Sequence, residues 1–359
     1  MKHLVLLGAG PAHQQVLREL AAQPLPATQV TLVHPSLRPM AAQHLAGWIA
    51  GRRSLDDSVT PLLPVAQRGH VTLIEGQVAT LDAGTRRITL ADGQEIAYDA
   101  LSLDADPGMD RDAIEGAREH ALFMQPTEQF VRLWEALLGL AQQHTLSVVV
   151  IGAGVAGVEL SLAVQRRLGK RARVALVTNG GPPLPGFPAS AQQRMQRILK
   201  RRNVTLFEER CVAIGGRQVM VGDGMRLVCD APLLVLPGRA PAWIEGSGLI
   251  VEDGRPAAGP TSQSTSHPEV FIAGGDHAAL ATNLRRFVAG GALVTAKPVQ
   301  PALQWVDCGE GDALVSWGRW SFDGRWVAWL LGRREPAVKA PVAVLPASEV
   351  ARPEADDQR

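Results

Sequence analysis

Two glycine-rich turns, each between a short apolar run and a helical pattern, constrain the fold of this 359-residue sequence most strongly. The first turn spans residues 8–13 and follows the apolar residues 4–7, and the second spans residues 152–157 and follows residues 148–151. A fully apolar run of this length is typical of a strand buried on both faces of a parallel sheet. In a GxGxxG turn the first glycine permits a tight bend, the second lets the backbone approach a pyrophosphate, and the third lets helix and strand pack closely. The two turns therefore predict an α/β protein with two Rossmann-like dinucleotide-binding domains.

The details of the two turns leave some alternatives open. One such turn also fits a tight bend without ligand, but two copies in the same context favour two dinucleotides, one held as a cofactor and the other exchanged. His13 replaces the third glycine of the first copy, and we expect its side chain to lift the helix slightly from the sheet. Neither copy has the usual acid for the ribose diol, because His34 and Asn179 stand after the second strands. His34 is either a ribose contact or a solvated loop histidine, and Asn179 gives no strong reason to reject a 2′-phosphate.

The rest of the chain supplies further strands and helices. Alternating apolar and polar residues predict antiparallel strands between the two turns, and short strands follow between residues 204 and 236. An apolar run then leads into a short helix, and the C-terminal part holds five of the eight tryptophans. The last residues lack any periodicity and are predicted to be a disordered tail. These features are the antiparallel segments 71–74, 86–90 and 96–103, the apolar run 270–273, the helix 278–288, the Trp-rich part 304–332 and the tail 335–359.

Composition argues against several classes of function. With 36 Lys and Arg against 35 Asp and Glu, the charge balance gives no reason to expect a nucleic-acid partner. Cys211, Cys229 and Cys308 lie far apart without a CxxC pair, which argues against a disulfide scaffold, a paired-cysteine redox centre and a metal site. The sequence has no apolar run of about 18 residues and no signal-peptide core. We therefore expect a cytoplasmic protein with at most peripheral contact to the inner face of the cell membrane.

Six stretches of the sequence resemble the two-dinucleotide-binding flavoproteins of the pyridine nucleotide–disulfide oxidoreductase superfamily. The resemblance is closest to the type II NADH dehydrogenase-like proteins, in the branch associated with selenide, water dikinase. It covers nearly all of residues 1–334, and the paired turns and the Gly-Gly-Asp segment ending at Asp276 are its most specific parts. The matching stretches are residues 4–18, 24–35, 98–104, 148–160, 264–278 and 314–329.

The resemblance implies a division of the chain and a set of ligands. FAD would lie in a domain formed by residues 1–118 and 255–300, and NAD(P)H would lie in a domain inserted over residues 119–254. Residues 301–334 would form small Trp-rich strands at the C-terminus. The fold expected is thus two Rossmann-like domains, one inserted in the other, with a small β-rich C-terminal segment.

The resemblance also assigns roles to individual residues. Asp276 would hold a ribityl hydroxyl of FAD, although a helix N-cap explains the same residue. Glu159 would lie where nicotinamide meets flavin and is the candidate catalytic residue, although an acid near the start of a helix is also favoured by the helix dipole. The candidate FAD-binding residues are Gly8, Gly10, Pro11, Ala12, His34, Val78 and Asp276, and the candidate NAD(P)H-binding residues are Gly152, Gly154, Gly157 and Gly238.

Three departures from the family pattern surround the expected flavin ring. The long segment that usually follows Gly-Asp is missing after Asp276, the loop at residues 37–43 lacks its usual pattern, and Asp104 begins a loop where the family has a glycine. The first hypothesis is an enzyme that passes a hydride from NAD(P)H to FAD and electrons on to a quinone or another small acceptor. The alternative is a degenerate, non-catalytic nucleotide-binding protein that has lost its acceptor site.

A homodimer is a further expectation.

The Trp-rich end has two interpretations. Its tryptophans and arginines could form an interfacial patch on lipid headgroups. The favoured interpretation is a hairpin of strands over residues 313–320 and 325–331, with tryptophans that pack on the flavin domain. We therefore expect at most salt-sensitive peripheral binding to membranes.

Overall fold

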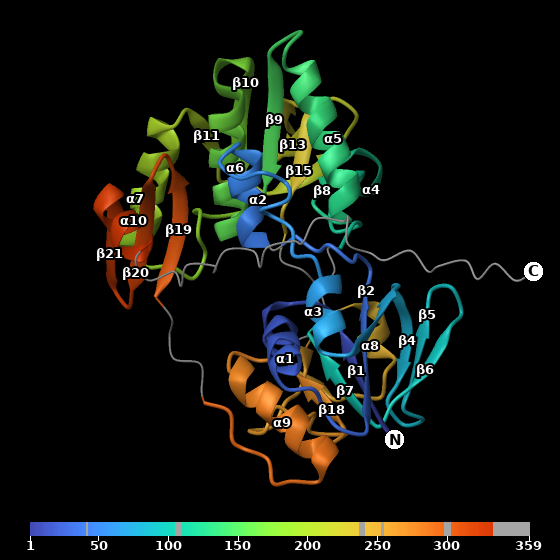
Figure 1. Ribbon diagram of the computed structural model, residues 1–359. Helices are drawn as coiled ribbons and strands as arrows, with labels where there is room; N and C mark the ends of the chain where they lie inside the picture. Colours follow the sequence, from blue (N-terminus) through green and yellow to red (C-terminus); the bar gives the residue numbers. More distant parts are fainter. Residues whose placement is uncertain (41, 105–109, 237–240, 253–254, 298–302, 333–359) are drawn as a thin grey trace, which may run out of the picture.

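The computed structural model describes the chain except residues 41, 105–109, 237–240, 253–254, 298–302 and 333–359. It has two lobes, each built on a five-stranded parallel sheet, and a small C-terminal sheet beside the upper lobe (Figure 1). The predicted α/β fold with two Rossmann-like units is confirmed by this topology. The tail predicted at residues 335–359 lies outside the described residues.

The lower lobe is built from parts of both chain segments that were predicted to form the first dinucleotide domain. Its sheet has the order β18-β7-β1-β2-β3, and every neighbouring pair is parallel. The strands are β1 (Lys2–Leu7), β2 (Thr28–His34), β3 (Val71–Glu75), β7 (Ala100–Leu103) and β18 (Val270–Ile272).

Each face of this sheet is covered by a different layer. Leu4 and Leu6 of β1 pack against helices on one face, whereas Val5 and Leu7 pack against a small antiparallel sheet on the other. All four side chains are at most 1% exposed, and burying each one stabilises the fold by about 1.5–3 kcal/mol. The helices are α1 (Pro11–Ala22), α3 (Leu63–Arg68) and α9 (His277–Ala289), and the small sheet is β4 (Val78–Asp82), β5 (Arg87–Leu90) and β6 (Glu95–Ala97).

Two of the strands predicted to be antiparallel are parallel instead. Residues 71–74 form β3, an edge strand of the main sheet that pairs in parallel with β2 and is only partly buried. The segment 96–103 is not one strand, because the chain leaves the small sheet after β6 and enters the main sheet as β7. β7 is buried along its whole length and pairs with β1 and β18.

The upper lobe repeats the arrangement of the lower one. Its sheet has the order β11-β10-β9-β15-β8, again parallel throughout. The strands are β8 (Leu122–Phe123), β9 (Leu146–Ile151), β10 (Ala172–Val177), β11 (Val204–Phe207) and β15 (Ala231–Leu234). Around them lie α4 (Ala117–His120), α5 (Thr127–Leu140), α6 (Val155–Leu168), α7 (Ala189–Arg201), the 3-10 turn Gly169–Arg171 and an antiparallel sheet of β12 (Cys211–Ile214), β13 (Gln218–Val221) and β14 (Met225–Val228).

Short elements connect the two lobes, and one early helix crosses between them. α2 (Ala42–Ile49) follows the first lobe in sequence, but its residues Leu45 and Ile49 join the core of the upper lobe beside α6. The predicted domain limits therefore do not separate the two cores at this helix. The chain returns to the lower lobe through α8 (Ala242–Glu245), β16 (Val251–Glu252) and β17 (Arg255–Pro256).

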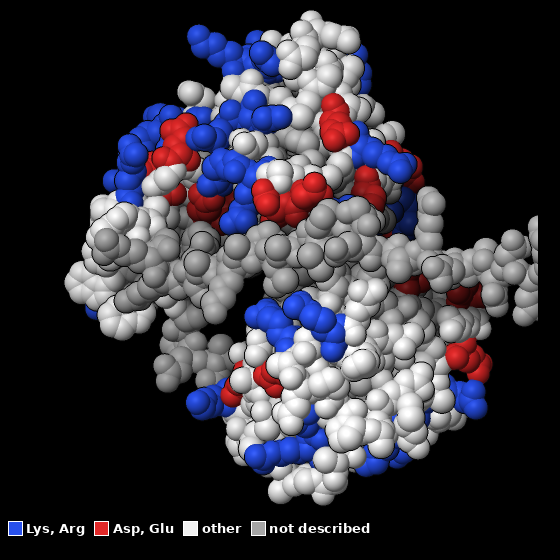
Figure 2. All heavy atoms as spheres, viewed as in Figure 1, with Lys and Arg blue, Asp and Glu red and all other residues white. Residues whose placement is uncertain are grey.

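The C-terminal sheet packs on the upper lobe, not on the flavin domain as predicted. It consists of β19 (Gln304–Gly309), β20 (Asp312–Trp317) and β21 (Trp320–Gly324), which contact α6 and α7. Ion pairs Arg202–Asp312 at 2.8 Å and Arg194–Asp323 at 2.5 Å join the sheet to the α7 region. Figure 2 shows basic and acidic side chains beside one another over the upper lobe.

Residues 325–331, predicted as a strand, form the helix α10 (Arg325–Gly332) instead. Gly324 has φ +125° and ends β21 there, so the apolar residues that follow pack as a helix on β20 and β21. The five tryptophans of the C-terminal sheet and α10 face outward, and their exposed fractions range from 42% to 69%. They are Trp305, Trp317, Trp320, Trp326 and Trp329.

Candidate functional site

The second glycine turn has the geometry that a dinucleotide turn requires. Gly152 adopts φ +150°, and a Cβ there would run into the carbonyl oxygen of Val235. A Cβ on Gly157 would run into the carbonyl oxygen of Gly152, so α6 packs against the turn more closely than any side chain allows. Gly154 is the N-cap residue of α6, and a Cβ on it would have no heavy atom within 4 Å. The space in front of Gly154 is therefore open to a phosphate at the N-terminus of the helix.

The first turn bends in the same way. Gly8 adopts φ +96°, and its N–H donates to the Val33 carbonyl at 3.0 Å. Gly10 is the N-cap residue of α1 with φ −64° and ψ 178°, close to the −72° and 178° of Gly154. Pro11 follows at the first helical position and Ala12 is buried, as expected for a helix that starts at the turn.

His13 replaces a backbone contact with a hydrogen-bonded bridge. Its buried ring places Nδ1 2.7 Å from the Gly8 carbonyl oxygen and Nε2 2.8 Å from Ser102 Oγ on β7. Burial lowers the pKa of His13, although the Asp104 charge and the Gly8 carbonyl oppose this effect. The neutral ring therefore donates from Nδ1 to Gly8 and accepts at Nε2 from Ser102. The displacement of α1 from the sheet by His13 stays a prediction. The structure does show that the His13 ring links α1 to the end of β1 and to β7.

Asp104 lies at the N-terminus of α1. It directly follows β7, and its Oδ2 accepts the His13 backbone N–H at 2.7 Å. A Cβ built on Gly10 would lie 2.6 and 2.8 Å from the two carboxylate oxygens of Asp104. A negatively charged side chain therefore occupies the position that the glycine leaves open for a phosphate. The sequence showed an aspartate where the family has a glycine, but it did not show that this carboxylate reaches the helix.

Asp276 lies at the start of α9, which packs beside α1 in the lower lobe (Figure 1). Its Oδ1 accepts from the Ala279 N–H at 3.0 Å, and its Oδ2 accepts from the Lys297 N–H at 2.9 Å. These two backbone donors hold the pKa of Asp276 below its usual range. The N-cap interpretation of Asp276 is confirmed. Each oxygen keeps a second lone pair for a ligand hydroxyl, so the ribityl role stays a prediction.

The other residues predicted for the first lobe lie around the same sheet. His34 ends β2, where its Nδ1 accepts the Ser36 N–H at 3.0 Å and lies 2.6 Å from the Ser36 carbonyl oxygen. Val78 begins β4 in the small antiparallel sheet and is partly buried against the core under that sheet. Their roles as ribose and adenine contacts stay predictions.

Glu159 lies in α6 and faces the C-terminal sheet. Its Oε1 accepts the backbone N–H of Asp307 on β19 at 2.8 Å, and Asp307 itself pairs with Arg52 at 2.5 Å. Burial raises the pKa of Glu159 to about 7, with a further increase from the Asp307 charge and opposing effects of the Asp307 N–H and Arg52. These contacts between distant segments had no signal in the sequence, and the catalytic role of Glu159 stays a prediction.

The nicotinamide-side residues are only partly described. Gly238 lies outside the described residues. Asn179 lies two residues after β10 with φ +63°, and its Oδ1 accepts the Cys211 N–H at 3.0 Å. The hydrogen bond to Cys211 uses one lone pair of this oxygen, and the NH₂ group of the same side chain can donate to a ribose hydroxyl.

The three cysteines are free and buried. Burial raises the pKa of Cys211 to about 11 and the pKa values of Cys229 and Cys308 to about 12. Thiols with such pKa values are protonated near neutral pH and do not act as nucleophiles.

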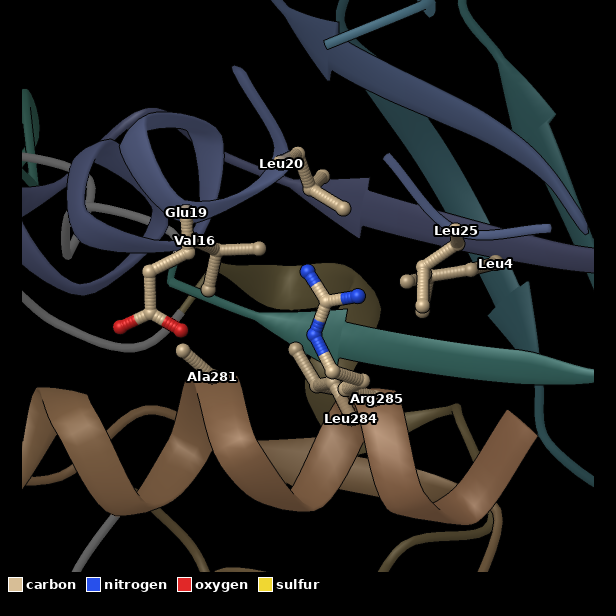
Figure 3. Close-up of a pocket in the computed structure, with 8 residues that line it drawn as sticks. All are labelled: Leu4, Val16, Glu19, Leu20, Leu25, Ala281, Leu284 and Arg285. Atoms are coloured by element: carbon tan, nitrogen blue, oxygen red, sulfur yellow. The ribbon is translucent and has the colours of Figure 1, made fainter. Parts of the chain in front are cut away.

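A small apolar cavity lies between α1 and α9 (Figure 3). Leu4, Val16 and Leu284 contribute to its lining together with the charged residues Glu19 and Arg285. Its volume of about 10 Å³ is at the lower limit for one water molecule. This cavity is a gap in helix packing and not a site for a nucleotide.

The structure has a double dinucleotide-binding fold. Each lobe has a parallel sheet with a glycine turn, and a helix, α1 or α6, starts at that turn. Residues 2–290 match the family described as pyridine nucleotide-disulphide oxidoreductase. The chain belongs to this family.

Sequence relatives are similar over part of their length. An alternative NAD(P)H-ubiquinone oxidoreductase of Arabidopsis thaliana is 29% identical over 161 residues, which cover 44% of this chain and 30% of the relative. A NADH dehydrogenase-like protein of Mycobacterium tuberculosis is 28% identical over 176 residues, which cover 47% of this chain and 43% of the relative. The matched parts span less than half the length of these curated relatives.

Solved structures share the fold at low sequence identity. The structure of NDH2 from Plasmodium falciparum in complex with NADH has a TM-score of 0.76 and 10% identity, with coverage of 93% of this chain and 94% of that chain. The sulfide:quinone oxidoreductase of Aquifex aeolicus has a TM-score of 0.72 and 16% identity, with coverage of 93% and 90%.

Family membership confirms the predicted superfamily, which is described as a class of pyridine nucleotide-disulphide oxidoreductases. The solved structures show the shared fold, and FAD as cofactor with NAD(P)H as co-substrate stays a proposal. The NADH dehydrogenase-like character agrees with the named relatives, whereas the selenide, water dikinase branch stays a prediction. In the part of the chain that the structure describes, no helix is long and apolar enough to cross a membrane.

The lower lobe fits FAD with one exception. The glycine turn, the N-terminus of α1 and the neighbouring Asp276 supply the bend, the N–H groups and the hydroxyl acceptor that a dinucleotide needs. The exception is Asp104, whose side chain must turn away before a phosphate can approach Gly10.

Proposed function

We propose that this protein passes a hydride from NAD(P)H to FAD and then passes electrons on to a quinone or another small acceptor. The observation that carries the proposal is the pair of matched glycine turns, one in each parallel sheet, with a helix N-terminus at each turn. Bound flavin would supply the two-electron chemistry, and the chain would bind and orient the two dinucleotides.

The residues assigned to each dinucleotide follow the two lobes. Gly8, Gly10, Pro11 and Ala12 would hold the FAD pyrophosphate at α1, with Asp276 at the ribityl chain and His34 and Val78 toward the adenosine. Gly152, Gly154, Gly157 and Gly238 would hold NAD(P)H. Glu159 would keep the catalytic role that the resemblance implies.

The acceptor is proposed from the names of relatives. The Arabidopsis relative is named an NAD(P)H-ubiquinone oxidoreductase, and a Synechocystis relative with 22% identity is named a demethylphylloquinone reductase. A quinone is therefore the first acceptor to test. The exposed tryptophans of the C-terminal segment suit salt-sensitive peripheral contact with a membrane surface. A homodimer stays a prediction.

The alternative is a non-catalytic nucleotide-binding protein. It is favoured by Asp104 at the first helix N-terminus and by the short segment after Asp276.

A crossed pair of variants tests the proposal. Gly10→Glu and Gly154→Glu place the same charge at the two turns. Gly10→Glu should lose bound flavin, whereas Gly154→Glu should keep flavin but lose its reduction by NAD(P)H. Flavin content is measured by absorbance after purification, and reduction is followed anaerobically. If Gly10→Glu keeps a full complement of flavin, the assignment of the first turn is wrong.

A further inference from the structure

We propose that Asp104 is an internal competitor for the first glycine turn, whose carboxylate must be displaced by an incoming pyrophosphate and which thereby sets how tightly the lower lobe holds a dinucleotide. This inference rests on the proposed binding of FAD at that turn. It gives Asp104, which lies outside the glycine motif, a role in controlling the affinity of that turn for a dinucleotide.

The two lobes provide an internal comparison for this side chain. The Asp104 N–H donates to Leu7 at 2.9 Å, and the Val235 N–H donates to Ile151 at 2.8 Å. Each residue is thus the first one after the strand that lies beside the glycine-turn strand, so Val235 is the counterpart of Asp104. In the second turn, where valine stands at this place, the space beside Gly154 is open. In the first turn, the Asp104 carboxylate fills the corresponding space beside Gly10.

The carboxylate takes both the space and the donor that a phosphate would use. Its oxygens lie 2.6 and 2.8 Å from the Cβ position of Gly10, closer than van der Waals contact. Its Oδ2 also accepts the N–H of His13 at 2.7 Å, and His13 is the third residue of α1, so this N–H is one of the groups that a helix N-terminus offers to an anion. A phosphate and this carboxylate cannot occupy the site together.

The start of α1 is held in place, so the side chain must move instead. The His13 ring bridges Gly8 and Ser102, which fixes the helix start against β1 and β7. Because burial lowers the pKa of His13, the neutral ring offers no positive charge to offset repulsion between Asp104 and a phosphate. Displaced Asp104 remains a negative charge close to the bound anion.

Without a ligand, the same carboxylate stabilises the helix. α1 has no side-chain cap of its own and no acid in its first turn. Asp104, which follows β7, therefore caps the N-terminus of α1 from outside the helix. The inference thus predicts two effects of opposite sign: removing the charge destabilises the ligand-free protein and tightens the binding of FAD.

The test compares two variants with a matched control in the flavin-free protein. Asp104→Asn removes the charge at constant shape, and Asp104→Val copies the second turn. The control is Asp99→Asn, because the Oδ2 of Asp99 also accepts one backbone N–H at 2.7 Å, from His3, and is not the carboxylate beside Gly10. Binding is titrated with FAD, with ADP as a pyrophosphate probe, and with adenosine as a probe without phosphate, and thermal unfolding is followed in parallel.

Both Asp104 variants should bind FAD and ADP at least about tenfold more tightly than the original protein, with adenosine affinity unchanged. The ligand-free melting temperature of Asp104→Val should fall by roughly 2 °C, the loss expected for one helix cap, whereas Asp104→Asn keeps an acceptor oxygen for the His13 N–H and should fall less. Asp99→Asn should leave all three affinities unchanged.

Each other outcome overturns the inference in a recognisable way. Equal FAD affinity in the original protein and both Asp104 variants refutes the competitor role and leaves the proposed function standing. Adenosine affinity that rises as much as FAD affinity refutes displacement of a carboxylate by a phosphate. No FAD binding by any of the proteins refutes both the inference and the proposed function.

Discussion

The raised pKa of Glu159 predicts a specific dependence of stability on pH. The Glu159 pKa lies near 7 in the folded chain against a usual value of 4.5, mainly because α6 and β19 bury the carboxyl group. Between about pH 4.5 and 7 the folded state keeps a proton that the unfolded state has lost. The free energy of unfolding should therefore fall as pH rises through this window and stay level above it. A shift from 4.5 to about 7 corresponds to up to about 3 kcal/mol at pH 8.

The substitution Glu159→Gln isolates this effect. The glutamine keeps a carbonyl oxygen for the Asp307 N–H but cannot ionise. Urea unfolding of both proteins at pH 5, 6, 7 and 8 should show the variant gaining stability relative to the original protein, up to about 3 kcal/mol by pH 8. Glu135→Gln on the exposed face of α5 is the control and should change stability equally at every pH. A constant difference between the Glu159→Gln and original proteins across this range would refute the reasoning.

Three further predictions follow from other parts of the molecule. Gly157→Ala places a methyl group against the Gly152 carbonyl, so it should lower the free energy of urea unfolding by about 1–3 kcal/mol and weaken NADH binding. The control Gly139→Ala in α5 adds a Cβ that meets nothing within 4 Å, and it should have neither effect. NADH and NADPH should reduce the protein at rates within about tenfold, or about 1.4 kcal/mol, because Asn179 carries no charge against a 2′-phosphate; a thousandfold difference in stopped-flow rates contradicts this. Sedimentation with anionic vesicles should show at most binding that high salt releases, and co-pelleting that survives high salt would contradict the expected weak contact.

Local sequence patterns were sufficient for the parallel strands beside the glycine turns. β1 and β9 each end in four apolar residues, 4–7 and 148–151, that lead directly into a glycine bend, so strand, turn and helix are encoded within about 20 residues. Whether β3 and β7 pair in parallel or antiparallel could not be predicted from their local sequence. β7 lies next to β1 and β18, and no pattern within residues 96–103 encodes those partners.

The contacts at the candidate site depend on residues far apart in the sequence. The hydrogen bond from His13 to Asp104 spans 91 residues, and the one from Asp307 to Glu159 spans 148 residues. The sequence identified His13, Asp104 and Glu159 as residues of interest, but their partners follow only from the three-dimensional arrangement. The same holds for the C-terminal sheet, whose amphipathic pattern fits several neighbours equally well.

Anaerobic titration of the purified protein with NADH tests the central claim most directly. The account predicts a yellow protein whose flavin absorbance is lost on addition of about one equivalent of NADH per flavin and returns when a quinone is added. A colourless protein that does not take up added FAD, or bound flavin that NADH and NADPH leave oxidised, would contradict the assignment of the two glycine turns to a working pair of dinucleotide sites.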